Sequence, residues 1–161
     1  MINLRRRLLV SKKKDFNLLD ADKFAELIMS YDTDVGALVE RDGRRCVAFR
    51  NNKMHNQDFT PCCPTFKEKT RYIFSFECLP NTPTESTNSL YYGFKPSPLK
   101  QIQANTTTEF TRIYAINYAN ATVTDIALSF GSAYAWLIDL DTVCLYEYDK
   151  FLELGGEAIW G

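Results

Sequence analysis

The sequence predicts an all-β protein: an antiparallel β-sandwich with a short N-terminal arm and one amphipathic helix. In several short segments, apolar and aromatic residues recur at every second position, the period of a strand with one buried face. Turn residues separate these segments, and several such strands need two sheets to hide their apolar faces. Because no long helical pattern connects the strands, an antiparallel sandwich is favoured over a parallel α/β sheet.

Composition sets the class of protein. The 161 residues suffice for one domain with a real core, and they are 45% hydrophobic and 24% charged, which is typical of a globular chain. The formal net charge of −1 argues against the broad basic surface of a nucleic-acid-binding protein.

The first unit, residues 1–32, contains a basic arm followed by a helix. The apolar run Leu8–Val10 within the arm is far too short for a signal peptide or a membrane span, so membrane insertion is not predicted. Either the arm contacts an acidic partner surface, or it is a solvated tail that orders only in an assembly. The predicted partner-binding side chains of the arm are Arg5, Arg6, Arg7, Lys12, Lys13 and Lys14.

One helix is predicted after the arm. Asp20 is a suitable N-cap, and Phe24, Leu27, Ile28 and Tyr31 share one helical face. We expect this helix to lie across an end of the sandwich. Packing against the core is favoured over docking to a partner.

The second unit, residues 33–150, is the predicted sandwich. Asp42-Gly43 is a strong hairpin signal between its first two strands. In segment 70–78, Tyr72, Phe74, Phe76 and Cys78 alternate with a second row that faces the opposite way. Segments 51–58 and 79–88 are rich in turn residues and predict exposed loops. The predicted strands are 36–40, 45–50, 70–78, 89–95, 109–118, 121–130 and 134–147.

The third unit, residues 151–161, is a tail that either covers an edge strand or contacts a neighbour. The five cysteines show none of the paired spacings of a zinc site, and His55 is the only histidine. Unbridged, buried thiols are favoured, as expected for assembly in a reducing cytoplasm. No nucleophile motif and no glycine-rich phosphate loop are present, so the chain is predicted not to be an enzyme.

The region from about 35 to 148 resembles the carbohydrate-binding-module type of jelly roll. Modules of this type recur in bacterial glycanases and in phage tail, fibre and decoration proteins. The passages that carry the likeness are Asp42–Phe49, Phe66–Phe76, Thr107–Tyr114 and Ile138–Glu147.

The resemblance, together with the basic arm, implies a phage virion structural or accessory protein. It would be assembled in the bacterial host cytoplasm, reside in the virion, attach through its arm and contact other virion proteins. Self-association into a homo-oligomer is also expected. The alternative is a glycan-binding module or adhesin that recognises cell-surface polysaccharide.

Sugar binding by such folds uses aromatic rings that cover the apolar face of a pyranose, with polar side chains at its hydroxyls. The predicted site residues are Tyr92, Arg112, Tyr114, Asn117 and Tyr118. Tyr91, Trp136 and Tyr146 are further aromatic candidates, and Trp136 is assigned to the core.

A structural calcium ion is common in the family, and no other cofactor is implied. The resemblance suggests Asp139 and Asp141 as calcium ligands, with Glu40 as the third and Asp42 as its alternative. Ordinary solvent-facing or hydrogen-bonded carboxylates are the favoured alternative for these residues.

Overall fold

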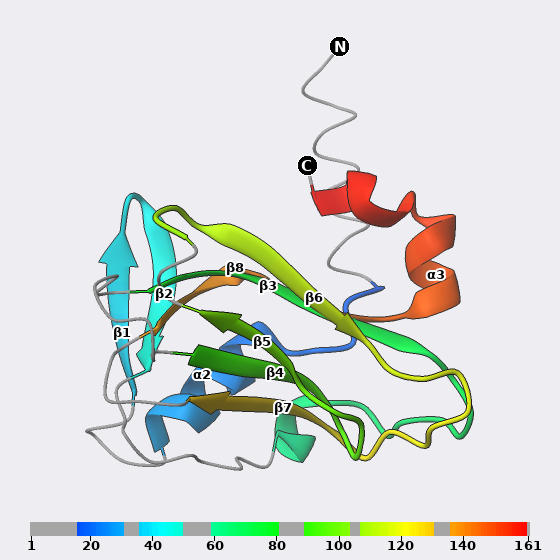
Figure 1. The fold of residues 1–161 in the computed structure, drawn as a ribbon. Coiled ribbons are helices and arrows are strands. Elements are labelled where there is room, and N and C mark those ends of the chain that lie inside the picture. The colour runs from blue at the N-terminus through cyan, green and yellow to red at the C-terminus, as the bar shows by residue number, and fades with distance from the viewer. Residues whose placement is uncertain are drawn as a thin grey trace.

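The structure, a computed structural model, describes residues 16–30, 36–49, 59–80, 89–103, 107–130 and 136–160. Two antiparallel sheets pack face to face (Figure 1), which confirms the predicted β-sandwich. The predictions for the basic arm, Tyr31, the His55 loop and most of the 79–88 loop lie outside the described residues.

The larger sheet has five strands in the order β1-β2-β8-β3-β6. Its first hairpin turns at Asp42 and Gly43, which both have positive φ (52° and 73°), as expected for the predicted Asp-Gly turn. The strands are β1 (Gly36–Arg41), β2 (Arg44–Phe49), β8 (Trp136–Glu147), β3 (Tyr72–Pro80) and β6 (Thr111–Ile116).

The smaller sheet has three strands in the order β5-β4-β7: β5 (Lys100–Gln103), β4 (Ser89–Lys95) and β7 (Asp125–Phe130). From β3 onward the chain crosses between the sheets, as in a jelly roll. All seven predicted strands are present. The sequence prediction missed β5, whose four residues contain a single apolar side chain.

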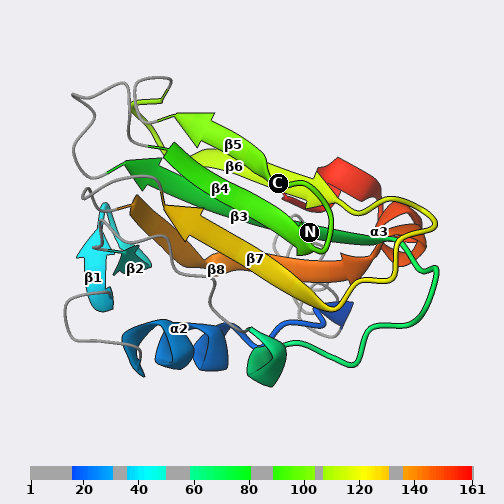
Figure 2. The ribbon, with the colours of Figure 1, turned by 60° about the horizontal axis from the view of Figure 1, so that its bottom comes forward.

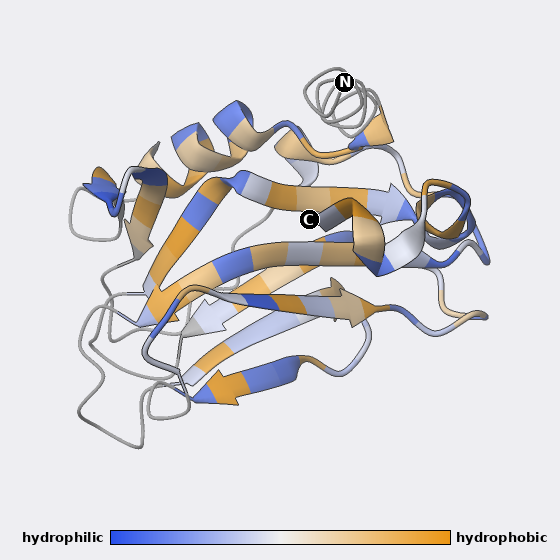
Figure 3. Ribbon diagram, turned by 90° about the horizontal axis from the view of Figure 1, so that it is seen from above, coloured by the Kyte–Doolittle hydropathy of each residue, from blue (hydrophilic) through white to orange (hydrophobic). Residues whose placement is uncertain are grey.

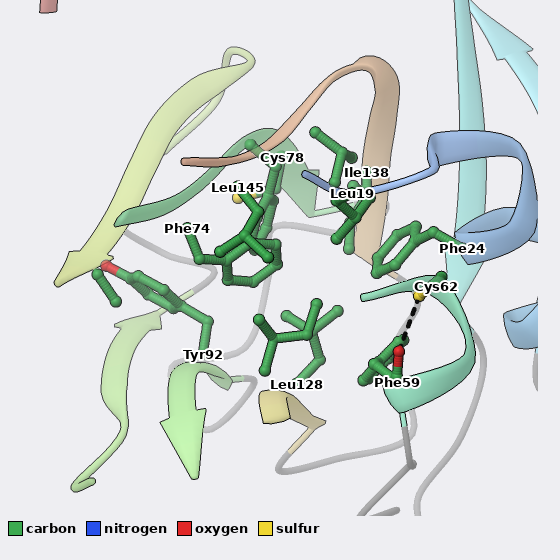
Figure 4. Close-up of a cluster of buried hydrophobic side chains, with 14 of the residues drawn as sticks. Leu19, Phe24, Phe59, Cys62, Phe74, Cys78, Tyr92, Leu128, Ile138 and Leu145 are labelled. Carbon is green, nitrogen blue, oxygen red and sulfur yellow. Dashed lines mark hydrogen bonds between the residues drawn. The ribbon is translucent and has the colours of Figure 1, made fainter. Parts of the chain in front are cut away.

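The core lies between the two sheets (Figure 4). Tyr72, Phe74, Phe76 and Cys78 point into it from β3 and are at most 1% exposed, as their alternation predicts. Ile73 points to the opposite face of the same sheet, where it joins a second apolar cluster. Both faces of β3 are therefore covered, which explains why almost all of its residues are buried.

Helix α2 (Ala21–Ser30) completes the second layer of the sandwich. The larger sheet has two more strands than the smaller one, and α2 packs on β1, β2 and β8 where no strand faces them (Figure 2). Phe24 and Ile28 are fully buried in the core, and hydrophilic residues lie on the outer side of the helix (Figure 3). The favoured core-packing role of this helix is thus the one observed.

The start of α2 is capped as predicted. The Asp20 carboxylate accepts hydrogen bonds from the backbone N–H groups of Asp22 and Lys23, both at 3.1 Å. A short 3-10 helix, η1 (Thr60–Cys62), lies next to α2 and brings Phe59 into contact with Phe24, with ring centroids 5.2 Å apart.

Strand β8 is interrupted by a bulge. Its residues 136, 138 and 140 point into the core, and beyond the bulge the inward residues are 143 and 145. Between Glu77 and Ser75 of β3, the partner residue on β8 moves from Asp139 to Cys144, which leaves extra residues on β8. This bulge lies near the middle of β8, the longest of the described strands, and it alters the shape of the protein surface beside it.

The C-terminal tail packs on a sheet face. Helix α3 (Tyr148–Glu153) and the 3-10 helix η3 (Gly156–Trp160) lie on the outer face of the larger sheet (Figure 1). Phe151 and Ile159 are buried there against Ile73 and Tyr146. The tail covers this face, and its Trp160 lies over Arg112 and Tyr114 of β6, an edge strand of the sheet.

Candidate functional site

The five predicted sugar-binding residues do not share one surface. Tyr92 points into the core, is 7% exposed and packs edge-on against Phe76, with ring centroids 5.9 Å apart (Figure 4). Burial raises the pKa of its phenol. Its ring is therefore part of the sandwich interior.

Asn117 is also buried and serves the backbone. Its Oδ1 accepts a short hydrogen bond from the Tyr72 N–H, and its Nδ2 donates to the carbonyls of Thr70 and Tyr118, both at 3.1 Å. These bonds tie the end of β6 to the start of β3. The next residue, Tyr118, is 63% exposed at this end of the sandwich.

Arg112 and Tyr114 lie together on the outer face of the larger sheet. The Trp160 ring from η3 covers both: its centroid is 5.6 Å from that of Tyr114 and 5.2 Å from the Arg112 guanidinium carbon. Arg112 also donates to the Thr142 carbonyl at 2.9 Å and to the Ser75 hydroxyl at 3.1 Å. These two side chains are thus already engaged by the chain itself.

A network of matched charges extends across the same face. Glu77 and Asp139 face each other on β3 and β8, and Arg44 donates to both carboxylates. Arg112 approaches Glu77 from the other side, at 3.4 Å. The hydrogen bonds to Glu77 and Asp139 raise the pKa of Arg44. Each cation here faces a carboxylate, so the network leaves little charge for a ligand.

Two of the three predicted calcium residues, Asp139 and Asp141, are paired with arginines. The Asp139 Oδ2 accepts from Arg44 at 2.8 Å, and Asp141 accepts from Arg45 at 3.2 Å. Among the described residues, no three His, Cys, Asp or Glu side chains gather closely enough to hold a metal ion. The calcium site at Glu40, Asp139 and Asp141 stays a prediction that these contacts do not support.

The outer face of the smaller sheet has a different chemistry. Tyr91 lies on its central strand, opposite Gln101 of β5 and Ser129 of β7. In the next row, Ser89 is opposite Gln103, and the Gln101 Nε2 donates to the Ser89 hydroxyl at 2.7 Å. Tyr91 is half-buried, the two glutamines are exposed, and Ser89 and Ser129 are buried at 4% and 2% exposure. This surface, the Tyr91 face, consists of those five uncharged polar residues.

The Tyr91 face has two further features. The Ser129 hydroxyl is buried and has no hydrogen-bond partner within the described residues, an arrangement that costs free energy. No described helix lies over these three strands, which Figure 2 shows side by side at the front. Tyr91 is among the further aromatic candidates predicted from the sequence, whereas Tyr92 is in the predicted site. The alternation of Leu90, Tyr92 and Phe94 with Ser89, Tyr91 and Gly93 contains the signal that places Tyr91 outside.

The five cysteines are unbridged thiols. All five lie within the described residues, none is in a disulfide, and only Cys63 is more than slightly exposed. Burial raises the pKa of Cys46 to about 11 and that of Cys78 to about 12. A hydrogen bond with the Cys62 thiol raises the pKa of Cys63. These three thiols are therefore protonated near neutral pH and are poor nucleophiles.

No protein-family model and no curated protein matches the chain. One similar solved structure contains the CBM22-1–GH10 modules of the Clostridium thermocellum endo-1,4-β-D-xylanase 10B, in complex with xylohexaose. It is 18% identical, covers 70% of this chain and has a TM-score of 0.42, while the match spans 24% of that chain. At this similarity the likeness carries no inference about a ligand. Within the described residues, no helix is long and apolar enough to cross a membrane.

Proposed function

We propose that the protein is a non-catalytic saccharide-binding β-sandwich and that the Tyr91 face is its binding surface. The observation that carries this proposal is the position of Tyr91, with amide and hydroxyl side chains as its cross-strand neighbours. An aromatic ring bordered by such groups fits the apolar face and the hydroxyl edge of a pyranose.

The chemistry of the face selects an uncharged ligand. Gln101 and Gln103 supply donors and acceptors for hydroxyl groups, and the five residues of the face carry no charge. The outer face of the larger sheet fits less well, because its arginines are paired with carboxylates and Trp160 already covers Tyr114. A neutral polysaccharide is therefore the ligand class that the geometry favours.

The test uses the full chain and a panel of neutral and acidic polysaccharides, first on an array and then by isothermal titration calorimetry. Tyr91→Ala should abolish binding of the neutral ligand while leaving the unfolding temperature nearly unchanged. Tyr118→Ala is the matched control, because its exposed ring lies elsewhere on the molecule and its loss should not affect binding. Binding that depends on Tyr118 and not on Tyr91 would show that the binding site is not the Tyr91 face. Failure to bind any polysaccharide would refute the proposed function.

The virion role is a separate proposal that rests on the sequence. Residues 1–15 carry six cationic side chains and one carboxylate, a net charge of +5, and the remaining residues carry −6. This separation of charge supports attachment through the arm. Deleting residues 1–15 should abolish incorporation into particles, and incorporation of the deleted chain would contradict the proposal.

A further inference from the structure

A cleft formed by described residues lies beside the β8 bulge. It has a volume of about 550 Å³, within the range of ligand-binding pockets. Its floor is apolar and consists of Leu19, Leu140 and Val143, which are all at most 4% exposed. Its mouth carries Asp22, Arg45 and Asp141.

The cleft exists because β8 changes its neighbour at the bulge. Up to Asp139 its partner is β2. Beyond the bulge the partner is the segment before α2: the Asn17 Nδ2 donates to the Val143 carbonyl at 3.0 Å, and the Leu18 N–H donates to the Leu145 carbonyl at 2.8 Å. Between these two partners the sheet is open.

The mouth of the cleft is acidic and loosely closed. Arg45 bridges Asp22 at 2.8 Å and Asp141 at 3.2 Å, so two carboxylates face one guanidinium. All three side chains are at least half exposed, and ion pairs of this kind contribute little to stability. An adjoining hollow of about 430 Å³ adds Glu40 and the exposed Leu38. Incoming cations can therefore replace Arg45 at small cost.

The N-terminal arm has the complementary pattern. Its apolar run Leu8–Val10 lies between the cations of Arg5–Arg7 and those of Lys12–Lys14. The cleft has the reverse arrangement, an apolar floor with carboxylates at its mouth. The net charges of +5 on residues 1–15 and −6 on the rest of the chain favour the same association.

We propose that the arm of a second copy of this chain binds in the cleft, with Leu8–Val10 on the apolar floor and the flanking cations at Asp22 and Asp141. The second copy is favoured because of where the described chain begins. Phe16 lies under the Lys150 side chain of α3, 4.7 Å from ring centroid to Nζ, and the next residue, Asn17, already lines the cleft. Residues 11–15 of the same chain would have to fold back at this point to lay Leu8–Val10 in the cleft, whereas the arm of a second copy needs no such turn.

The contact is heterologous, because the arm of one copy meets the cleft of the next. Repetition of such a contact gives a ring if the rotation closes and a filament if it does not. This inference is independent of saccharide binding, because the Tyr91 face belongs to the other sheet.

The test measures self-association of the full chain by sedimentation velocity over a range of concentrations. At about 0.1 M salt the chain should associate, and at about 1 M salt, where the screening length falls from about 10 Å to about 3 Å, it should dissociate. The double variant Asp22→Lys/Asp141→Lys should weaken association by about tenfold or more. Asp149→Lys is the matched control, because this carboxylate on α3 is 89% exposed. Its replacement should leave self-association unchanged.

A charge-reversed arm provides the decisive check. A chain with Arg5, Arg6 and Arg7 replaced by glutamate should not associate alone, and it should associate with the Asp22→Lys/Asp141→Lys chain when the two are mixed. A chain that stays monomeric at every concentration in low salt would overturn the proposal. Association that depends on the arm and not on Asp22 and Asp141 would overturn the assignment of the cleft.

Discussion

Removing the Phe24 ring tests whether α2 belongs to the core. Phe24 and Phe59 are both fully buried, and their rings stack at 5.2 Å between α2 and the segment of η1. Phe24→Ala should lower the free energy of unfolding by about 3–5 kcal/mol, the usual cost of such a truncation in a core. This is a large share of the roughly 5–15 kcal/mol that stabilises a domain.

The assay is urea unfolding followed by tryptophan fluorescence, since Trp136 is fully buried and reports loss of the core. A double-mutant cycle with Phe24→Leu and Phe59→Leu should give a coupling of about 0.5–1.5 kcal/mol. Glu26→Ala, on the exposed side of α2, is the control and should change stability by less than about 0.5 kcal/mol. If Phe24→Ala lowers the free energy of unfolding no more than Glu26→Ala does, α2 is not a core element. The alternative role of α2, docking to a partner, would then be favoured.

Three further predictions concern local structure. In urea unfolding, Asp20→Ala should lower the free energy of unfolding by about 1 kcal/mol, and Asp20→Asn should lower it much less. Equal losses in the two variants would argue against an N-cap role for Asp20. Asn117→Ala should lower the free energy of unfolding by about 2 kcal/mol, because the Tyr72 N–H loses its acceptor. The folded fraction of this variant should still bind saccharide. A stable variant that no longer binds would place Asn117 in the sugar site. The pKa of Cys78 rises from 9.0 to about 12 on folding, so its contribution to stability is complete below pH 9 and is lost as the pH rises toward 12, by about 1.4 kcal/mol per pH unit. Between pH 8 and 11 the free energy of unfolding of Cys78→Ala should fall less steeply with pH than that of the parent chain. Equal slopes for the two chains would show that the Cys78 thiol does not cause the decline.

The alternation of side chains allowed most of the fold to be predicted from the sequence. In β3 the two rows of side chains were separated correctly because Tyr72, Phe74 and Phe76 alternate without a break. Strand β5 was missed because Ile102 is its single apolar residue. The bulge in β8 was missed as well, since the sequence is apolar on both sides of Asp141 and the change of inward residue is visible only in the pairing with β3.

The candidate site was harder to predict, for a physical reason. Residues of one surface come from strands far apart in sequence, so their grouping depends on register. Tyr91 meets Gln101 and Ser129 only because β4 lies between β5 and β7. Arg112 and Tyr114 lie on one face of β6, within the predicted strand 109–118, but no sequence pattern indicates that Trp160 folds back over them. The uncharged character of the Tyr91 face is therefore a property of the assembled sheet.

The two outer faces of the sandwich are not equivalent, and the difference bears on both proposals. The larger sheet is covered at one end by α3 and η3, and its centre carries paired charges, although Arg112 Nε and Trp160 Nε1 on that face have no hydrogen-bond partner among the described residues. The smaller sheet has no described helix over it, and the Ser129 hydroxyl is left without a partner among the described residues. The exposed glutamines beside Tyr91 are accessible to a ligand, which favours the Tyr91 face. The cleft lies at the β8 bulge in the other sheet, so a neighbour's arm and a saccharide can bind at the same time. Tyr91→Ala should therefore leave self-association unchanged, and Asp22→Lys/Asp141→Lys should leave saccharide binding unchanged. Loss of both activities in either variant would show that one site serves both.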